Sequence, residues 1–231
     1  MSPADAAPLR PLKLCDSQGF TYAAFISWPH ALSERGMEIV EELARSLEDS
    51  FRTHIDDGRP RVFFDKDRMK AGYKWADILR RSVCRSVVVI PILVPTYFDS
   101  EYCSIEWGIA EALGRRRLPA VGGHTAFIPI TLVPMEELVP PSEVGSVQFE
   151  KDFEDLIVWG DEVKTHPKWR KLIENLRKLI FDQIRIVCAN PRNWEEEEQL
   201  AQQQSGARFS WPQLPDLAPA PFPSMKAVES K

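Results

Sequence analysis

Residues 86–94 read SVVVIPILV, and this nearly unbroken apolar run decides the fold class. A strand with one wet face alternates apolar and polar residues, whereas a strand covered on both faces, as in a parallel sheet, is apolar throughout. The run therefore predicts a strand inside a parallel sheet. Pro91 interrupts it and removes one ladder hydrogen bond, so we expect a bend here or a position near the sheet edge.

Strand-like and helix-like patterns alternate on both sides of this run. The expected strands are FTYAAFISW (20–28), RVFF (61–64), FIPITLV (127–133) and a last short one, SVQFEKDF (146–153). The expected helices run from an N-cap at Ser33 to about 54, from 75 to 83, from 99 to 113 and from 167 to 187. This order predicts an α/β fold, a flavodoxin-like doubly wound parallel sheet of about five strands flanked by helices.

The composition fits one folded domain with extensions. The chain has 231 residues, of which 44% are hydrophobic and 27% charged, as in globular proteins with a packed core. We expect a flexible segment at 1–19, a folded domain at 20–189 and a disordered acidic and Pro-rich tail at 190–231. The net charge of −5 argues against nucleic acid as a partner, and the basic run GRRRL (114–118) is interpreted as a solvated helix end.

The cysteines and the lengths of the apolar runs indicate the cellular compartment that the protein is expected to occupy. Cys15, Cys84, Cys103 and Cys188 are scattered, without the spacing of a metal site, and are predicted to be free thiols in a reducing cytosol. No apolar run approaches the ~20 residues that cross a bilayer, and the N-terminus lacks a signal-peptide pattern. We expect a cytoplasmic protein without a membrane or metal partner.

One carboxylate stands out in DSEYCSIEWGIAEAL (99–113), where Ser100 is the expected N-cap. At 100° per residue, one core-facing sector contains Tyr102, Ile105, Ile109, Ala112 and Leu113. Glu106 lies on the flank of that sector, whereas Glu111 lies on the opposite face. A partly desolvated carboxylate is unfavourable unless it is paired or functional. A rim glutamate whose methylenes cover apolar surface is the plainer interpretation.

Three stretches, in this order, resemble a Toll/interleukin-1 receptor (TIR) domain, over about residues 20–187. They are YAAFISW (22–28), RVFFDKDRMKAGYKWADIL (61–79) and YFDSEYCSIEW (97–107), with FIPI (127–130) where the family has its fourth strand. Val94, Pro91 and the long stretch 135–166 depart from the family pattern. The likeness is to stand-alone bacterial members.

The resemblance implies an NAD⁺ or NADP⁺ glycohydrolase in signalling or antiphage defence, with Glu106 as the catalytic residue. The dinucleotide is the substrate, and no cofactor is needed. Nicotinamide leaves as a neutral ring, and a fixed carboxylate stabilises the oxocarbenium-like ribose. By position, Phe25, Ile26 and Ser27 would lie under the dinucleotide and Arg68 near its pyrophosphate. The candidate stacking rings are Trp28, Tyr73, Trp75 and Tyr97.

The resemblance also implies a homo-oligomer built by head-to-tail contacts through the loop Asp65–Tyr73, weak as a monomer and active when clustered. The main alternative is a non-catalytic TIR adaptor that acts through TIR–TIR contact; an acid at the position of Glu106 favours the enzyme. Two further alternatives are a receiver domain phosphorylated on Asp65 and a nucleoside deoxyribosyltransferase, a kind of enzyme that also uses a glutamate on a similar sheet.

Overall fold

The computed structural model describes residues 19–54, 60–64, 75–118, 126–133, 162–189 and 192–204, without the side chains of 75 and 76. The four strands found there form a parallel sheet in the order β2-β1-β3-β4. They are β1 (Tyr22–Ser27), β2 (Val62–Phe63), β3 (Ser86–Leu93) and β4 (Ile130–Thr131). The predicted parallel α/β class is confirmed. The fifth expected strand, 146–153, lies outside the described residues.

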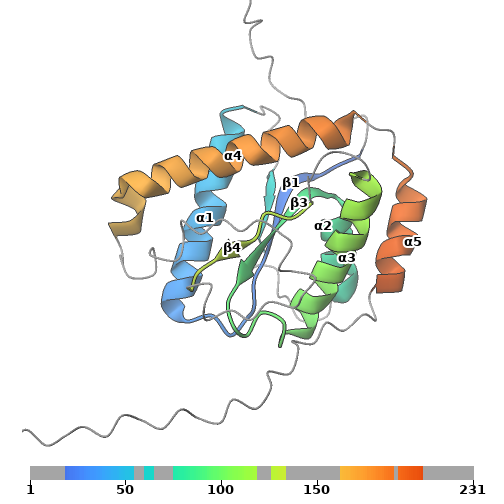
Figure 1. Ribbon diagram of the computed structural model, residues 1–231, viewed down its shortest axis with the longest axis horizontal. Helices are drawn as coiled ribbons and strands as arrows, with labels where there is room; N and C mark the ends of the chain where they lie inside the picture. The colour runs from blue at the N-terminus through green and yellow to red at the C-terminus, as the bar shows by residue number, and fades with distance from the viewer. Residues whose placement is uncertain are drawn as a thin grey trace, which may run out of the picture.

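Helices cover both faces of the sheet (Figure 1). One face carries α1 (Glu34–Arg52) and α4 (Pro167–Cys188), and the other carries α2 (Trp75–Cys84) and α3 (Glu101–Arg117). The central strands β1 and β3 are buried along almost their whole length, as their apolar sequences require. A fifth helix, α5 (Trp194–Gln204), packs on the outside of α2 and α3.

Pro91 lies inside the sheet, in β3, which pairs with β1 on one side and β4 on the other. β3 is therefore not an edge strand of the described sheet, but it lies next to the last strand, β4, which agrees with the expected position near the edge. The nitrogen of Val89 donates to the carbonyl of Ala126, and its carbonyl accepts from Ile128. Residues two apart on a strand face the same neighbour, so Pro91 presents its nitrogen toward β4 as well. The regular pairing of β3 with β4 resumes only at Ile92. No ladder hydrogen bond is therefore required from the nitrogen of Pro91.

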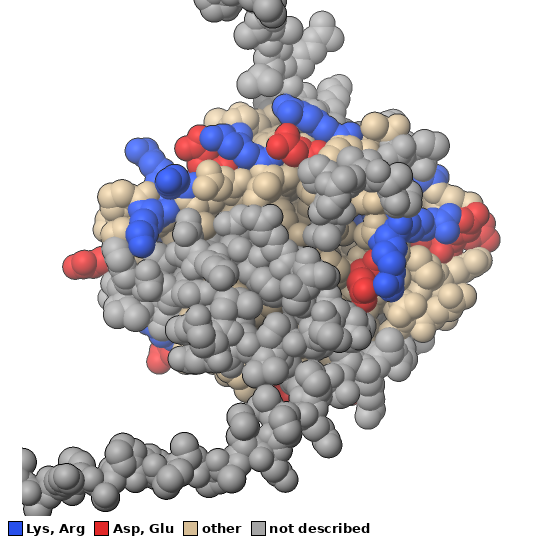
Figure 2. All heavy atoms as spheres, in the orientation of Figure 1, with Lys and Arg blue, Asp and Glu red and all other residues tan. Residues whose placement is uncertain are grey.

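The helix ends follow the capping residues in the sequence. Ser33 accepts a hydrogen bond from the nitrogen of Gly36 at 3.1 Å, and Ser100 accepts one from Cys103 at 3.4 Å, so both predicted N-caps are confirmed. The third cap is His166, which accepts from Lys168 at the start of α4. Helix α4 buries an apolar stripe against the sheet. In Figure 2, basic side chains follow α4 along the top of the molecule, with acidic ones among them.

The expectation of a disordered tail from residue 190 onward is wrong for residues 194–204, which form helix α5. Its acidic run meets the basic end of α3, so that Arg116 pairs with Glu196 and Arg117 with Glu197. Arg117 is 2% exposed, so its part of GRRRL is buried and not solvated. Its guanidinium also donates to the carbonyls of Ser86 and Cys84. Helix α5 forms although its sequence is poor in apolar residues, because its glutamates form ion pairs with the arginines at the end of α3.

The cysteines differ from the expectation at one position. Cys84 and Cys103 are free and buried, whereas Cys188 is disulfide-bonded. The prediction of a free thiol is therefore wrong for Cys188, and Cys15 lies outside the described residues. Among the described helices, none combines the length and the apolar character needed to cross a bilayer.

Candidate active site

The carboxylate of Glu106 lies on the second turn of α3, beside the carboxyl end of β1. It is 6% exposed. Its Oε2 accepts a hydrogen bond from the Oγ of Ser27, the last residue of β1, at 2.5 Å. The carboxyl ends of parallel strands are where α/β sheets bind ligands. The contact joins two residues that are 79 positions apart in the chain, and both were predicted site residues.

Tyr97 extends this contact into a directed chain of hydrogen bonds. Its hydroxyl lies 2.6 Å from the Oγ of Ser27. Burial, followed by the nearby Cys103 and Glu106, raises the pKa of Tyr97 well above its ordinary value, so the phenol keeps its proton. Ser27 gives its only proton to Glu106 and therefore accepts from Tyr97. The phenol polarises the serine, which in turn fixes the carboxylate.

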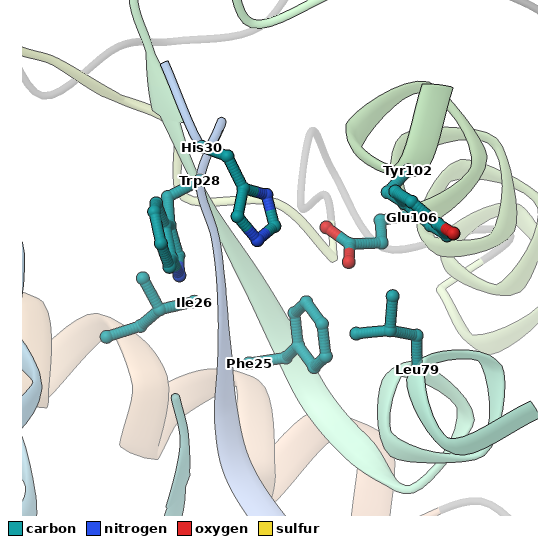
Figure 3. A pocket seen from close by; sticks show the side chains of 7 residues that line it. All are labelled: Phe25, Ile26, Trp28, His30, Leu79, Tyr102 and Glu106. Atoms are coloured by element: carbon teal, nitrogen blue, oxygen red, sulfur yellow. The ribbon is translucent and has the colours of Figure 1, made fainter. Parts of the chain in front are cut away.

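A small pocket opens beside this carboxylate (Figure 3). Its volume is about 20 Å³, which is room for about one water molecule. Phe25 and Leu79 lie on one side of the carboxylate, and the ring of His30 lies between Trp28 and Glu106. Among the described residues, the lining consists of Phe25, Ile26, Trp28, His30, Leu79, Tyr102 and Glu106.

The other predicted binding residues have different places. Phe25 faces the pocket, and Ile26 also lines it, although its side chain points away from Glu106 (Figure 3). Trp28 is half-buried and packs against Phe64 with ring centroids 5.9 Å apart. Tyr97 has no exposed surface, so its predicted role as a stacking ring is wrong: it supports Ser27 from within the core.

Three predicted residues cannot be placed at the site. Arg68 and Tyr73 lie outside the described residues, as does the whole loop Asp65–Tyr73. Trp75 begins α2, but its side chain is outside the described part. Their roles toward a pyrophosphate, an aromatic ring or a second copy of the chain stay predictions.

Three residues of the described lining, His30, Leu79 and Tyr102, were not predicted as parts of the site. Tyr102 was placed on the core side of its helix but is 43% exposed at the pocket rim. It precedes Glu106 by four residues, and this spacing puts both side chains on one helix face. His30 follows β1 by three residues. The sequence did offer one indication of a place in the site. His30 directly follows a central strand, and ligands of parallel sheets bind at the carboxyl ends of the strands.

The thiol near the carboxylate is not a nucleophile. Burial, with a further contribution from Glu106, raises the pKa of Cys103 from 9.0 to about 12, so it stays protonated at neutral pH. Within the described ranges, no group of three or more His, Cys, Asp or Glu residues is arranged to hold a metal ion. What the described site offers is a fixed carboxylate next to aromatic and apolar surface.

Comparison with known families agrees with this architecture. A family model for the TIR domain matches residues 25–158, which is more than half of the chain and includes Glu106. A search of curated proteins finds no match to this chain.

Proposed function

Because this chain belongs to the TIR-domain family, we propose that it is an NAD⁺ glycohydrolase that cleaves the bond between nicotinamide and ribose. The enzymes of this family carry out that reaction with a glutamate at the position of Glu106. The observation that carries the proposal is the burial of Glu106 beside the pocket, with its Oε2 held by Ser27. NADP⁺ is a second candidate substrate, and signalling or antiphage defence is the proposed setting.

The reaction needs one fixed negative charge. When the C1′–N bond breaks, its electron pair passes to the pyridinium nitrogen, so nicotinamide leaves neutral without a proton donor. The positive charge then develops on the ribose. A carboxylate in a site of low dielectric attracts that charge more strongly than one in water. Water adds to C1′ and loses a proton, which gives ADP-ribose; attack by a group of the substrate itself would give a cyclic product instead.

Ser27 and Tyr97 prepare Glu106 for this role. A carboxylate that must first reorient loses part of the stabilisation that it gives to the transition state. The hydrogen bond from Ser27 fixes the carboxylate, and the buried phenol of Tyr97 fixes the serine. Both are positioning residues, because they act through Glu106.

The experiment that tests the proposal is incubation of the purified protein with NAD⁺ and, separately, NADP⁺, with nicotinamide and the ribosyl product separated by chromatography. We expect nicotinamide release, more per molecule at higher protein concentration if head-to-tail contacts complete the site. Absence of nicotinamide at every concentration would refute the enzyme.

That negative result would favour the non-catalytic adaptor that acts through TIR–TIR contact. One observation supports this second candidate: the pocket of about 20 Å³ does not accommodate a nicotinamide ring without a side-chain movement. Sedimentation analysis of the same samples measures self-association directly.

A further inference from the structure

The pocket beside Glu106 must open before a ligand reaches the carboxylate. Its volume of about 20 Å³ holds about one water molecule, whereas sites for small molecules usually measure ~300–1,000 Å³. If a nicotinamide ring is to lie beside Glu106, at least one lining side chain has to move.

Burial identifies the side chains that can move. Phe25 and Ile26 are each 1% exposed and Leu79 is 6% exposed, so their displacement would disturb the packed core. Of the lining residues that the structure describes, His30 and Tyr102 are the exposed ones. Of these two, the ring of His30 lies directly between Trp28 and the carboxylate (Figure 3).

The chemistry of the pocket makes the position of His30 depend on its charge. Its imidazole packs near the indole of Trp28, with ring centroids 5.0 Å apart, and points toward Glu106. Glu106 and the phenol of Tyr102, both on α3, are the titratable groups that share the described pocket lining with it. A protonated imidazole is attracted to the carboxylate, and it then occupies the place of another planar cation, the nicotinamide ring of NAD⁺.

We propose that His30 is a proton-controlled gate over Glu106: as a cation it pairs with the carboxylate and excludes the cationic ring, and as a neutral ring it moves outward and admits it. The gate rests on the proposed cleavage of NAD⁺ for its physiological meaning. It predicts competition between a proton on His30 and the substrate, so acidity raises KM more than it lowers kcat.

The kinetic test compares the wild type with His30→Gln, which keeps a polar side chain but cannot become a cation. Histidine is the side chain whose charge changes between pH 5 and pH 8, so we expect KM for NAD⁺ to rise by about tenfold more between pH 7.5 and pH 5.5 in the wild type than in His30→Gln. Glu106 is present in both proteins, so the two differ only in the ionisable group at position 30. His54→Gln, which alters an exposed histidine at the end of α1, should behave like the wild type.

Two kinetic outcomes would overturn the gate. The first is an equal pH dependence of KM in the wild type and His30→Gln. The second is a more than tenfold loss of kcat at both pH values with unchanged KM, because this would identify a catalytic residue and not a gate.

A binding experiment separates failure of the gate from failure of the proposed function. The probe is 1-methylnicotinamide, a pyridinium cation methylated on the ring nitrogen and without a ribosyl bond to cleave, and its binding is followed by NMR at pH 7.5 and pH 5.5. Tenfold weaker binding at pH 5.5 in the wild type, with no such change in His30→Gln, supports the gate even if NAD⁺ is never cleaved. The same pH dependence in both proteins, or no binding at either pH, overturns the gate even if NAD⁺ is cleaved.

Discussion

Replacing Glu197 by alanine should release or destabilise α5 much more than replacing its exposed neighbours. Glu197 is 1% exposed, and its Oε2 accepts from the Nε and Nη2 of Arg117 at 3.0 and 2.6 Å. Its Oε1 accepts from Arg192 at 3.4 Å. The alanine leaves a buried guanidinium without its counter-charge, which costs about 3–5 kcal/mol. That is a large part of a typical total stability of about 5–15 kcal/mol.

The assay is urea unfolding followed by circular dichroism, together with hydrogen exchange of the α5 amides. The matched control is Glu198→Ala, because Glu198 pairs with Arg85 but its side chain is 48% exposed; we expect a loss below about 1 kcal/mol. If α5 undocks in Glu197→Ala so that Arg117 regains water, the loss will appear in the exchange of α5 before the global transition. Equal stability of the two variants and unchanged protection of α5 would refute the reasoning.

Three further predictions concern the site and the packing around it. Ser27→Ala removes a hydrogen bond to a charged group, worth about 1.5–3 kcal/mol, so the rate of nicotinamide release should fall by at least about tenfold. Tyr97→Phe should lower that rate by a smaller factor. Unchanged rates in both variants would contradict the positioning role of these residues. Burial raises the pKa of Cys84 from 9.0 to about 11 and of Cys103 to about 12. The thiols of the unfolded chain therefore lose their protons at lower pH than those of the folded protein, and the free energy of unfolding should fall as the pH rises from about 9 to about 12. Iodoacetamide at pH 8 should modify both thiols only after unfolding. Fast labelling of the folded protein would argue against their burial. Gly19→Ala should destabilise the protein by about 1–3 kcal/mol, because φ is +78° and a Cβ would lie 2.8 Å from the indole nitrogen of Trp194; a melting temperature equal to that of the wild type would contradict this.

The sheet could be predicted because its signals are local. An unbroken apolar run between amphipathic segments fits only a strand with helices on both sides, and SVVVIPILV became β3 in the interior of the sheet. The N-caps at Ser33 and Ser100 were equally local. The reason why Pro91 fits inside the sheet could not be predicted. It depends on where the pairing between β3 and β4 is interrupted, and the sequence of β3 does not show this.

The environment of α3 could not be predicted from its own sequence. A helical projection assigns one face to the core, but α3 is buried on further faces because α5 covers it. The pairing of Arg117 with Glu197 joins two charge runs 80 positions apart, each of which is typical of a solvated surface when considered alone. Charge complementarity between distant runs was the missing signal.

The candidate site was predictable in its central residue and less so in its surroundings. Glu106 could be identified because a carboxylate beside an apolar helix sector needs a reason, and the TIR resemblance supplied one. Tyr97 was expected to face a ligand, yet its hydroxyl points to Ser27; an aromatic residue after a strand can serve either purpose. The place of His30 depends on how the chain leaves β1, which residue patterns do not specify.

The central claim is that the charge of Glu106 drives cleavage of the ribosyl bond. The most direct measurement is the rate of nicotinamide release at saturating NAD⁺ for the wild type, Glu106→Gln and the matched control Glu111→Gln. The control alters a half-buried glutamate of the same helix, which pairs with Arg115 and does not line the described pocket. Loss of one charge-stabilising group lowers such rates by about 10²–10³-fold, so we predict a loss of that size in Glu106→Gln and a rate within about twofold of the wild type in Glu111→Gln, with all three proteins folded. A Glu106→Gln variant that releases nicotinamide as fast as the wild type would contradict the account.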